Sequence, residues 1–371
     1  MEILKNKNLL RKLTIVVLSF NRQKYILRSM RYWSNKGVIM HVLDGSKEAI
    51  SPKYFLGIED NIQYHHFPVS FAERLVRASS LITSEYAVLM GDDEFYIPSA
   101  LDDCIQELEH DISLVSCVGR CIGFDHNHGT LKTNLMYEAM ANYSVHHDNP
   151  DDRVLYHMKN YIPSTIYSVM RADIWKHTIS CIDNEAYQVF ALEELQFEIA
   201  SSYLGKSKVL PILSWLRSSE NQGMADKTQL KKIHDWWGDH LNDKLREQML
   251  SEFTHKLLKD QGDVNVKHVQ EVIARSVELY MSIPKQQQPT RSIIIFQVAK
   301  LLSMLPRIIK DMLKKQAHKT YYNLQNHKGI DAISEQLEID GVYVDYKELK
   351  NVEKIIIDFH KNQEEIMAVQ K

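Results

Sequence analysis

Residues 86–98, YAVLMGDDEFYIP, place three consecutive acids directly after an apolar run. The run from Tyr86 to Met90 has the length and composition of a buried strand. Open α/β sheets bind their ligands at the carboxyl ends of the strands, so Asp92, Asp93 and Glu94 are predicted to line a ligand site. Carboxylates without neighbouring Cys or His suit Mg²⁺ or Mn²⁺, shared with substrate phosphates. The alternative is a strand followed by a solvated acidic turn.

Strand-like and helix-like segments alternate around this stretch. Strand-like runs cover 13–18, 38–43, 62–67, 86–90 and 114–119, and helical spacing marks 23–33, 71–82, 99–109 and 191–204. Such alternation predicts βαβ units and a mostly parallel sheet. The polar, His-rich stretch 124–153 is predicted to form long loops. Helical patterns dominate after Gly223, so we place a domain boundary near residue 225, between an α/β domain (1–225) and a mainly helical domain (226–371).

The bulk composition is that of an ordinary globular protein, with 371 residues, 44% hydrophobic and 25% charged. A net charge of −3 gives no overall attraction to nucleic acid, so we predict no such partner. Four cysteines without a CxxC pair argue against a disulfide or zinc framework. The sequence shows neither a run of about 18 apolar residues nor a signal-peptide cleavage site. These features together predict a cytoplasmic protein.

Two polar turns and an arginine-bearing helix accompany the acidic motif. SFNR, residues 19–22, follows the first strand-like run, and LDGS, residues 43–46, follows the second. Both turns could contact a nucleotide. Alternatively, the first is a helix cap and the second a tight Asp-Gly turn. Arg74 and Arg77 lie one helical turn apart, and we expect one of them to face a ligand.

In this order, SFNR, LDGS, the arginine-bearing helix and VLMGDDEFYIPSAL resemble the family 2-like glycosyltransferases of the GT-A fold, over about residues 12–217. The GDDEF version is similar to a bacterial branch of that superfamily. The resemblance implies a GT-A (Rossmann-like) domain that binds a nucleotide sugar. It also implies that the nucleotide, diphosphate and donor sugar are contacted by Phe20, Asn21, Arg22, Asp44, Ser46, Arg74, Asp92 and Arg217.

The same resemblance implies that the acidic motif holds a divalent metal, Mg²⁺ or Mn²⁺. This sequence departs from the D-x-D pattern of the family, because Gly91 stands where many relatives have the first acid and Glu94 where they have the last. Which two of the three acids bind the metal is therefore open. We rank Asp93 and Glu94 above Asp92.

A second acidic pair opens the segment ALEELQFE, residues 191–198. It resembles the family's acid pair at a helix start, whose second member deprotonates the acceptor hydroxyl, although here the pair is Glu-Glu instead of Glu-Asp. Glu194 is thus the predicted base and Glu193 its neighbour. A helix N-terminus stabilises an ionised carboxylate. The alternative is the ordinary enrichment of acids in a first helical turn. Glu198 is expected to face solvent or an internal arginine.

The C-terminal half contains an apolar segment, residues 292–315, with basic residues at helical spacing. Its basic face consists of Lys300, Arg307, Lys310 and Lys314. The wider stretch 291–319 has seven basic residues against one acid. A basic amphipathic helix is typical of peripheral contact with anionic lipid on the inner face of the membrane. The alternative is a helix packed on the first domain or on a second subunit of a homo-oligomer.

The sequence therefore predicts a hexosyltransferase-type glycosyltransferase, inverting and metal-dependent. Its expected donor is a UDP- or GDP-sugar, and its expected acceptor is a hydroxyl of a saccharide or a lipid-linked molecule in bacterial surface-polysaccharide or glycoconjugate synthesis. Two alternatives remain, a nucleotidyltransferase and a non-catalytic carbohydrate-binding or scaffold protein on the same fold. A P-loop enzyme is disfavoured because the sequence contains no GxxxxGK[ST] motif.

Overall fold

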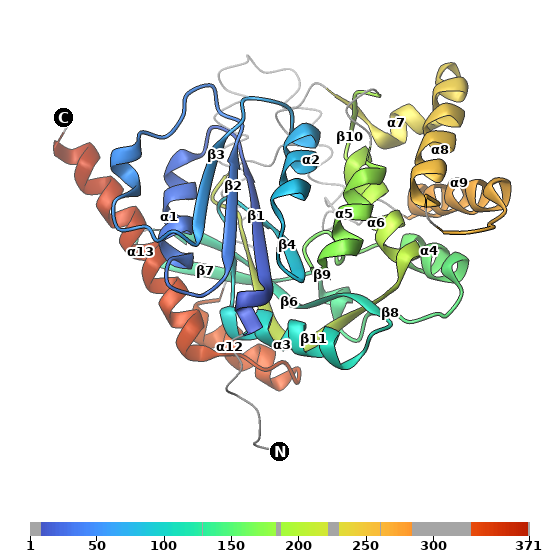
Figure 1. Ribbon diagram of the computed structural model, residues 1–371. Helices are drawn as coiled ribbons and strands as arrows, with labels where there is room; N and C mark the ends of the chain where they lie inside the picture. The colour runs from blue at the N-terminus through green and yellow to red at the C-terminus, as the bar shows by residue number, and fades with distance from the viewer. Residues whose placement is uncertain are drawn as a thin grey trace, which may run out of the picture.

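A mixed, parallel-rich sheet of ten strands forms the centre of the computed structural model (Figure 1). The strand order is β3-β2-β1-β4-β9-β6-β11-β5, with β7 paired to β6 and β8 paired to β11. The strands are β1 (Leu13–Ser19), β2 (Ile39–Asp44), β3 (Ile62–His66), β4 (Tyr86–Gly91), β5 (Phe95–Tyr96), β6 (Leu114–Asn127), β7 (Thr130–Met136), β8 (Ser144–Val145), β9 (Val169–Arg171) and β11 (Lys206–Ser218). Strands β1 to β4 run parallel, as predicted.

The structure describes residues 9–127, 129–182, 187–221, 230–259, 261–283 and 328–369. Its helices are α1 (Gln23–Trp33), α2 (Phe71–Leu81), α3 (Pro98–His110), α4 (Pro150–Lys159), α5 (Ala172–Cys181), α6 (Leu192–Leu204), α7 (Ile233–Gly238), α8 (Asp243–Leu257), α9 (Val266–Ser282), α12 (Ile330–Ile339) and α13 (Tyr346–Val369). The predicted amphipathic segment 292–315 lies outside the described residues. Within them, every helix is too short or too polar to cross a bilayer.

Alternating side chains of the central strands pack into two apolar cores, one on each face of the sheet. In β1, Ile15 and Val17 join a core that also contains residues of α1, α3, α12 and α13, whereas Val16 joins a core formed with α2 and α5. Strands that are buried on both faces become nearly continuous apolar runs, which is why LTIVVLS and YAVLMG were recognisable in the sequence.

The stretch 124–153 is more regular than the predicted long loops. Strand β6 continues to Asn127, and β7 pairs antiparallel with it from Thr130, forming a hairpin. The alternation in TLKTNLM buries Leu131 and Thr133, but it is short and polar and so was missed in the sequence. Helix α4 follows, and the side chain of Asn149 caps it by accepting from the Asp151 amide at 2.8 Å.

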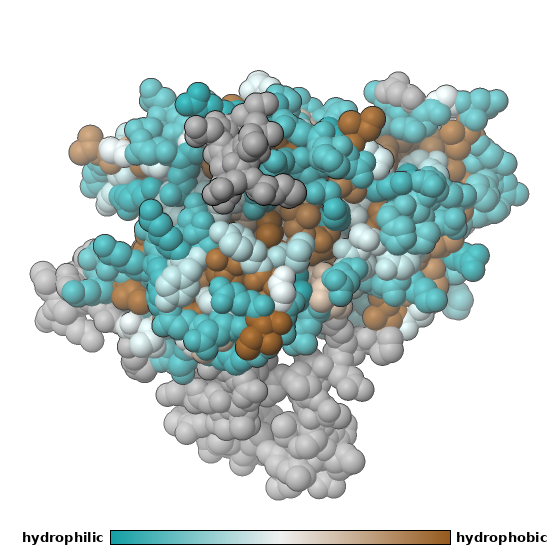
Figure 2. Space-filling model, turned by 90° about the horizontal axis from the view of Figure 1, so that it is seen from below, coloured by the Kyte–Doolittle hydropathy of each residue, from teal (hydrophilic) through white to brown (hydrophobic). Residues whose placement is uncertain are grey.

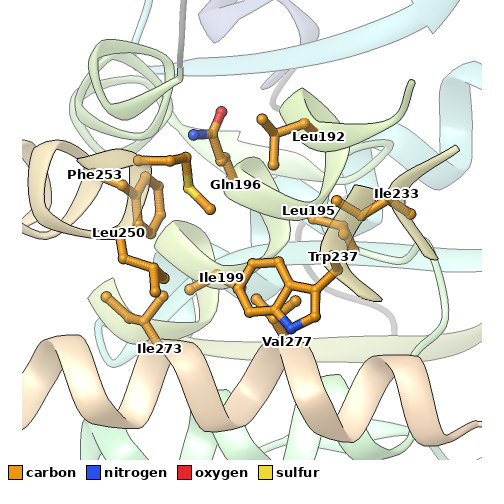
Figure 3. A pocket seen from close by; sticks show the side chains of 11 residues that line it. Leu192, Leu195, Gln196, Ile199, Ile233, Trp237, Leu250, Phe253, Ile273 and Val277 are labelled. Atoms are coloured by element: carbon orange, nitrogen blue, oxygen red, sulfur yellow. The ribbon is translucent and has the colours of Figure 1, made fainter. Parts of the chain in front are cut away.

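Helices α4, α6, α7, α8 and α9 build a second apolar core beside the sheet. A short parallel pair, β10 (Val189–Phe190) and β12 (Lys231–Lys232), lies at its edge. Figure 3 shows a cavity in this core, lined by apolar side chains and Gln196. Its volume of about 10 Å³ suffices for one water-sized sphere, so it cannot hold a sugar. We therefore regard it as a packing space.

The last described segment returns to the sheet. Lys328 and Thr133 exchange backbone hydrogen bonds of 2.8 Å, and the Leu213 amide donates to the Tyr343 carbonyl at 2.8 Å. Helix α13 runs along α1 and β7 (Figure 1). The two described parts of 226–371 thus pack on different layers, α8 and α9 on the second core and α12 and α13 on the sheet. The boundary at residue 225 stays a prediction.

The surface seen from below is mostly hydrophilic, with apolar residues scattered over it in small groups (Figure 2). Scattered exposed apolar residues are normal on folded proteins.

Candidate active site

The three motifs that follow the parallel strands lie side by side. Ser19, the last residue of β1, is in register with Asp44 of β2, and Leu18 is in register with Gly91 of β4. The turns after these strands therefore meet at one edge of the sheet. Such an edge is where open α/β sheets bind their ligands.

Asp92 and Asp93 are buried and share a cation. Arg22 donates Nη1 to Asp92 Oδ1 at 3.0 Å and to Asp93 Oδ2 at 3.4 Å. Ser19 Oγ donates to Asp92 Oδ2 at 2.6 Å, and Asn221 Nδ2 donates to Asp93 Oδ2 at 2.6 Å. Burial, followed by repulsion from Asp93, raises the pKa of Asp92 to about 6, although Arg22 acts to lower it.

Glu94 turns back toward β11. Trp215 Nε1 donates to Glu94 Oε2 at 2.8 Å, and Arg217 Nε lies 3.8 Å from Glu94 Oε1. Burial raises the pKa of Glu94 to about 7, while Arg217 acts to lower it. A Cβ atom at Gly91 would lie 2.7 Å from Glu94 Cδ. A side chain at position 91 would therefore displace the Glu94 side chain from this place.

The acidic motif offers carboxylate oxygens to a divalent metal, but no complete set of protein ligands among the described residues. Among the described residues, no three His, Cys, Asp or Glu side chains are grouped to hold an ion. The predicted pair also faces different partners, Asp93 toward Arg22 and Asn221, and Glu94 toward Trp215 and Arg217. Hard oxygen donors in a buried, acid-rich site nevertheless suit Mg²⁺ or Mn²⁺, which needs one or two carboxylates when phosphates supply other ligands.

Asp44 is fully buried and already bonded. It accepts hydrogen bonds from the Ser46 amide at 2.9 Å, from Tyr64 Oη at 2.8 Å and from Gln23 Nε2 at 3.3 Å. These bonds hold the turn after β2, so a nucleotide base could reach Asp44 only if one donor moved aside. The predicted contact of Asp44 with a nucleotide stays a prediction.

The turn after β1 presents a different surface. Phe20 is 50% exposed, and Asn21 has a left-handed backbone with φ of 57°. The Asn21 amide donates to Ser46 Oγ at 2.8 Å, which ties this turn to the turn after β2. Phe20 is thus an open aromatic face beside the acids, and a base or ribose could pack against it.

Arg74 lies behind the two turns. Its guanidinium is buried and donates to the backbone carbonyls of Ser19, Leu43 and Ser70. A Cβ atom at Gly45 would lie 2.6 Å from Arg74 Cζ, so a side chain there would displace the guanidinium. These bonds fix the ends of β1 and β2. The predicted contact of Arg74 with a diphosphate stays a prediction. Arg77 is exposed and pairs with Glu73 at 2.5 Å.

The second acidic pair begins α6. The Tyr161 hydroxyl donates to Glu194 Oε1 at 2.5 Å, and the Tyr161 ring packs edge-on against Tyr280 of α9 at 4.9 Å. Burial raises the pKa of Glu194, and the bond from Tyr161 acts to lower it. Glu193 is half-buried beside it. Glu194 is therefore a carboxylate held in a fixed direction by a tyrosine.

Tyr167 connects the two acidic groups. Its ring stacks on Trp215 at a centroid distance of 4.5 Å, and Trp215 bonds to Glu94. The pKa of Tyr167 is raised by burial first, and then by the charges of both Glu94 and Glu194. The residues before it, Thr165 and Ile166, donate to Glu198, which lies one helical turn after Glu194 on α6. Segment 165–167 thus contacts both Trp215, the partner of Glu94, and the helix that carries Glu194.

The expectation for Glu198 was wrong. It is fully buried, and it accepts from His157 Nε2 at 2.8 Å and from the Ile166 amide at 3.1 Å. The Thr165 hydroxyl and amide donate to it as well. Helix α6 is enclosed on almost all sides, so this acid points inward and fixes the segment that carries Tyr167.

Sequence reasoning missed several residues around the two acidic groups: Ser19, Arg28, Trp215 and Asn221 at the acidic motif, Tyr161 at Glu194, and Tyr167 between them. Most come from strands or loops far from the motif along the chain, and pairing between such segments leaves no local pattern. Arg28 could have been found from the sequence, because helical spacing places this arginine on the apolar face of α1, where it is buried.

Comparison with known proteins supports the fold. No family model and no curated protein matches the sequence. Among solved structures, S. aureus TarS 1–349 in complex with UDP-GlcNAc is 12% identical with a TM-score of 0.50, over 76% of this chain and 75% of that chain. The mannosyltransferase PcManGT from Pyrobaculum calidifontis, in complex with GDP-Man and Mn²⁺, is 12% identical with a TM-score of 0.39, over 85% and 83%.

The similarity to TarS confirms the predicted fold class, a mixed α/β fold with a parallel-rich central sheet. At 12% identity it shows the fold alone, and the TM-score of the second structure is too low to support an inference. The function must be argued from the site itself.

Proposed function

We propose that the protein transfers a sugar from a nucleotide sugar to a hydroxyl group. The observation that carries the proposal is that segment 165–167 joins the two acidic groups: Tyr167 stacks on Trp215, the partner of Glu94, and Thr165 and Ile166 bond to Glu198, one turn after Glu194 on α6. One acidic group lies at the sheet edge that favours a nucleotide, and the other offers an oriented base. Glycosyl transfer needs both, a site for the leaving nucleoside diphosphate and a base for the incoming hydroxyl.

On the donor side, cations and a metal would stabilise the departing diphosphate. Arg22 and Arg217 are the two partly exposed cations at the acids, and they lie where negative charge would grow. Asp93 and Glu94 would hold Mg²⁺ or Mn²⁺, which supplies further charge stabilisation when bound. Asp92 would orient Arg22, and Phe20 would contact the nucleoside.

On the acceptor side, Glu194 would act as the base. Its raised pKa makes it a stronger base than an ordinary glutamate, and the Tyr161 hydroxyl holds it in place. The acceptor oxygen would lose its proton to Glu194 and bond to the anomeric carbon as the bond to the diphosphate oxygen breaks. Attack from the face opposite the leaving group inverts the configuration.

The finer assignments rest on the sequence. We propose a UDP- or GDP-sugar as the donor and a saccharide or lipid-linked acceptor of bacterial surface-polysaccharide synthesis. We also propose a cytoplasmic protein that contacts the inner face of the membrane through 291–319. That segment lies outside the described residues. A homo-oligomer also stays a proposal.

A screen of donors tests the proposal. The full chain is incubated with UDP- and GDP-sugars and Mg²⁺ or Mn²⁺, and release of nucleoside diphosphate is measured with and without saccharide acceptors. Metal-dependent release supports a glycosyltransferase. Release of pyrophosphate from nucleoside triphosphates would instead indicate a nucleotidyltransferase. Tight binding of a sugar nucleotide or saccharide without turnover would indicate a scaffold protein.

A further inference from the structure

Helix α13 contacts the acidic site through Arg28 of α1. The Arg28 side chain is 2% exposed, and its guanidinium lies over the rings of Tyr25 and Phe95 at 4.9 Å and of Phe359 at 4.8 Å. Phe359 belongs to α13, and its ring packs against Tyr25 at 5.3 Å. A C-terminal helix thus encloses a cation that belongs to the first helix of the fold.

A chain of hydrogen bonds runs from α13 to the acidic motif. His360 Nε2 donates to Glu220 Oε1, and Arg28 Nη1 donates to Glu220 Oε2 at 2.9 Å. Arg28 Nη2 in turn donates to the Asp93 carbonyl at 2.8 Å. The Glu220 side chain is 3% exposed, so its charge depends on these two partners.

The segment 217–221 contacts both parts of the acidic motif. Arg217 faces Glu94, and Asn221 bonds to the Asp93 carboxylate. Glu220, between them, is the residue that α13 anchors. The position of this segment therefore determines where Arg217 and Asn221 lie relative to Glu94 and Asp93.

We propose that His360 is a positioning residue of the donor site, acting through Glu220 on segment 217–221. The donor role of that segment rests on the proposed function, whereas its anchoring by His360 does not. Removing the imidazole leaves one oxygen of a buried carboxylate without its donor, so the segment loosens. Helix α13 is then part of the donor site, although it lies about 270 residues after the acidic motif.

Hydrogen exchange of the ligand-free protein tests the anchoring. We compare His360→Ala, His360→Gln, whose amide can donate to Glu220, and the control Lys361→Ala, an exposed neighbour on the same helix. We expect about 10-fold faster exchange of the amides of 218–221 in His360→Ala at an unchanged melting temperature, with His360→Gln close to the wild type. Equal exchange in His360→Ala and the control would overturn the proposal.

Donor binding tests the consequence. With UDP or GDP and Mn²⁺ as calorimetric probes, we expect His360→Ala to weaken binding about 10-fold, and KM for the donor to rise while kcat changes much less. A fall in kcat with unchanged KM would overturn the donor-site role. If the wild type bound no nucleoside diphosphate, the proposed function would fail, and hydrogen exchange would still decide whether His360 anchors the segment.

Discussion

At the scale of single residues, Gly91 leaves room for the Glu94 side chain. The Glu94 carboxyl lies against the glycine and accepts from Trp215, so the space for a side chain at 91 is already taken. The bond between Glu94 and β11 therefore depends on a glycine at this position.

We therefore expect Gly91→Ala to destabilise the fold by about 1–3 kcal/mol, because Glu94 must leave Trp215. Chemical denaturation measures this change in the free energy of unfolding. Gly238→Ala is the matched control, since a Cβ atom there meets nothing within 4 Å. Equal stability of the two variants would show that the Glu94 side chain can adopt another position without loss of stability.

The pKa of Glu194 gives a second residue-scale prediction. Burial raises it above the ordinary 4.5, and a base must be ionised, so kcat/KM should rise with pH through a midpoint above 4.5. The Tyr161 bond lowers this pKa, so Tyr161→Phe should move the midpoint to higher pH. The pH profiles of the two proteins decide this. A midpoint unchanged by the substitution would show that the Tyr161 hydroxyl does not affect the pKa of the base.

At the scale of elements, α6 is the clearest case of what a sequence can and cannot reveal. The acids of its first turn were found because a helix start has a local pattern. The direction of Glu198 was missed because it depends on His157 of α4 and on the backbone of 165–166, which are distant in sequence. The hairpin of β6 and β7 was missed because its alternation is short and polar.

Glu198 should accordingly be a stability residue of this layer. We expect Glu198→Gln to lower the free energy of unfolding by about 1–3 kcal/mol, because an amide cannot accept all the hydrogen bonds that reach this carboxylate. Glu247→Gln, an exposed exchange on α8, is the control. Thermal and chemical denaturation measure the stabilities. If Glu198→Gln were as stable as the wild type and the control, the buried hydrogen-bond network would not contribute to stability as proposed.

At the scale of the whole molecule, the parallel strands and the motif order were predictable because buried strands and their turns are local features. The return of α12 and α13 to the sheet was not. Ile330, Leu349 and Val352 fill the same core as β1 and α1, although helical periodicity alone assigned them to a separate domain. A chain cut near residue 285 would lose these core residues, so it is a poor probe of the segment 291–319.

Membrane contact is better tested in the full chain. Reversing the charges of Lys300, Arg307, Lys310 and Lys314 to Glu should reduce co-sedimentation with vesicles rich in anionic lipid, because the attraction to the surface is electrostatic. Four Lys→Glu exchanges at exposed sites on α8, on α9 and in the loop between them (Lys244, Lys256, Lys259 and Lys267) match the change in charge. Equal binding of the two variants would leave only the packing explanation for this segment.

The central claim is that Asp93 and Glu194 serve one reaction from two sides of a single site. The most direct test is metal-dependent release of nucleoside diphosphate from the best donor, measured together with nucleotide binding. We predict that Asp93→Ala loses metal-dependent nucleotide binding, whereas Glu194→Gln keeps it and turns over at least about 10²-fold more slowly. Wild-type turnover by Glu194→Gln, or unchanged nucleotide affinity in Asp93→Ala, would contradict the claim.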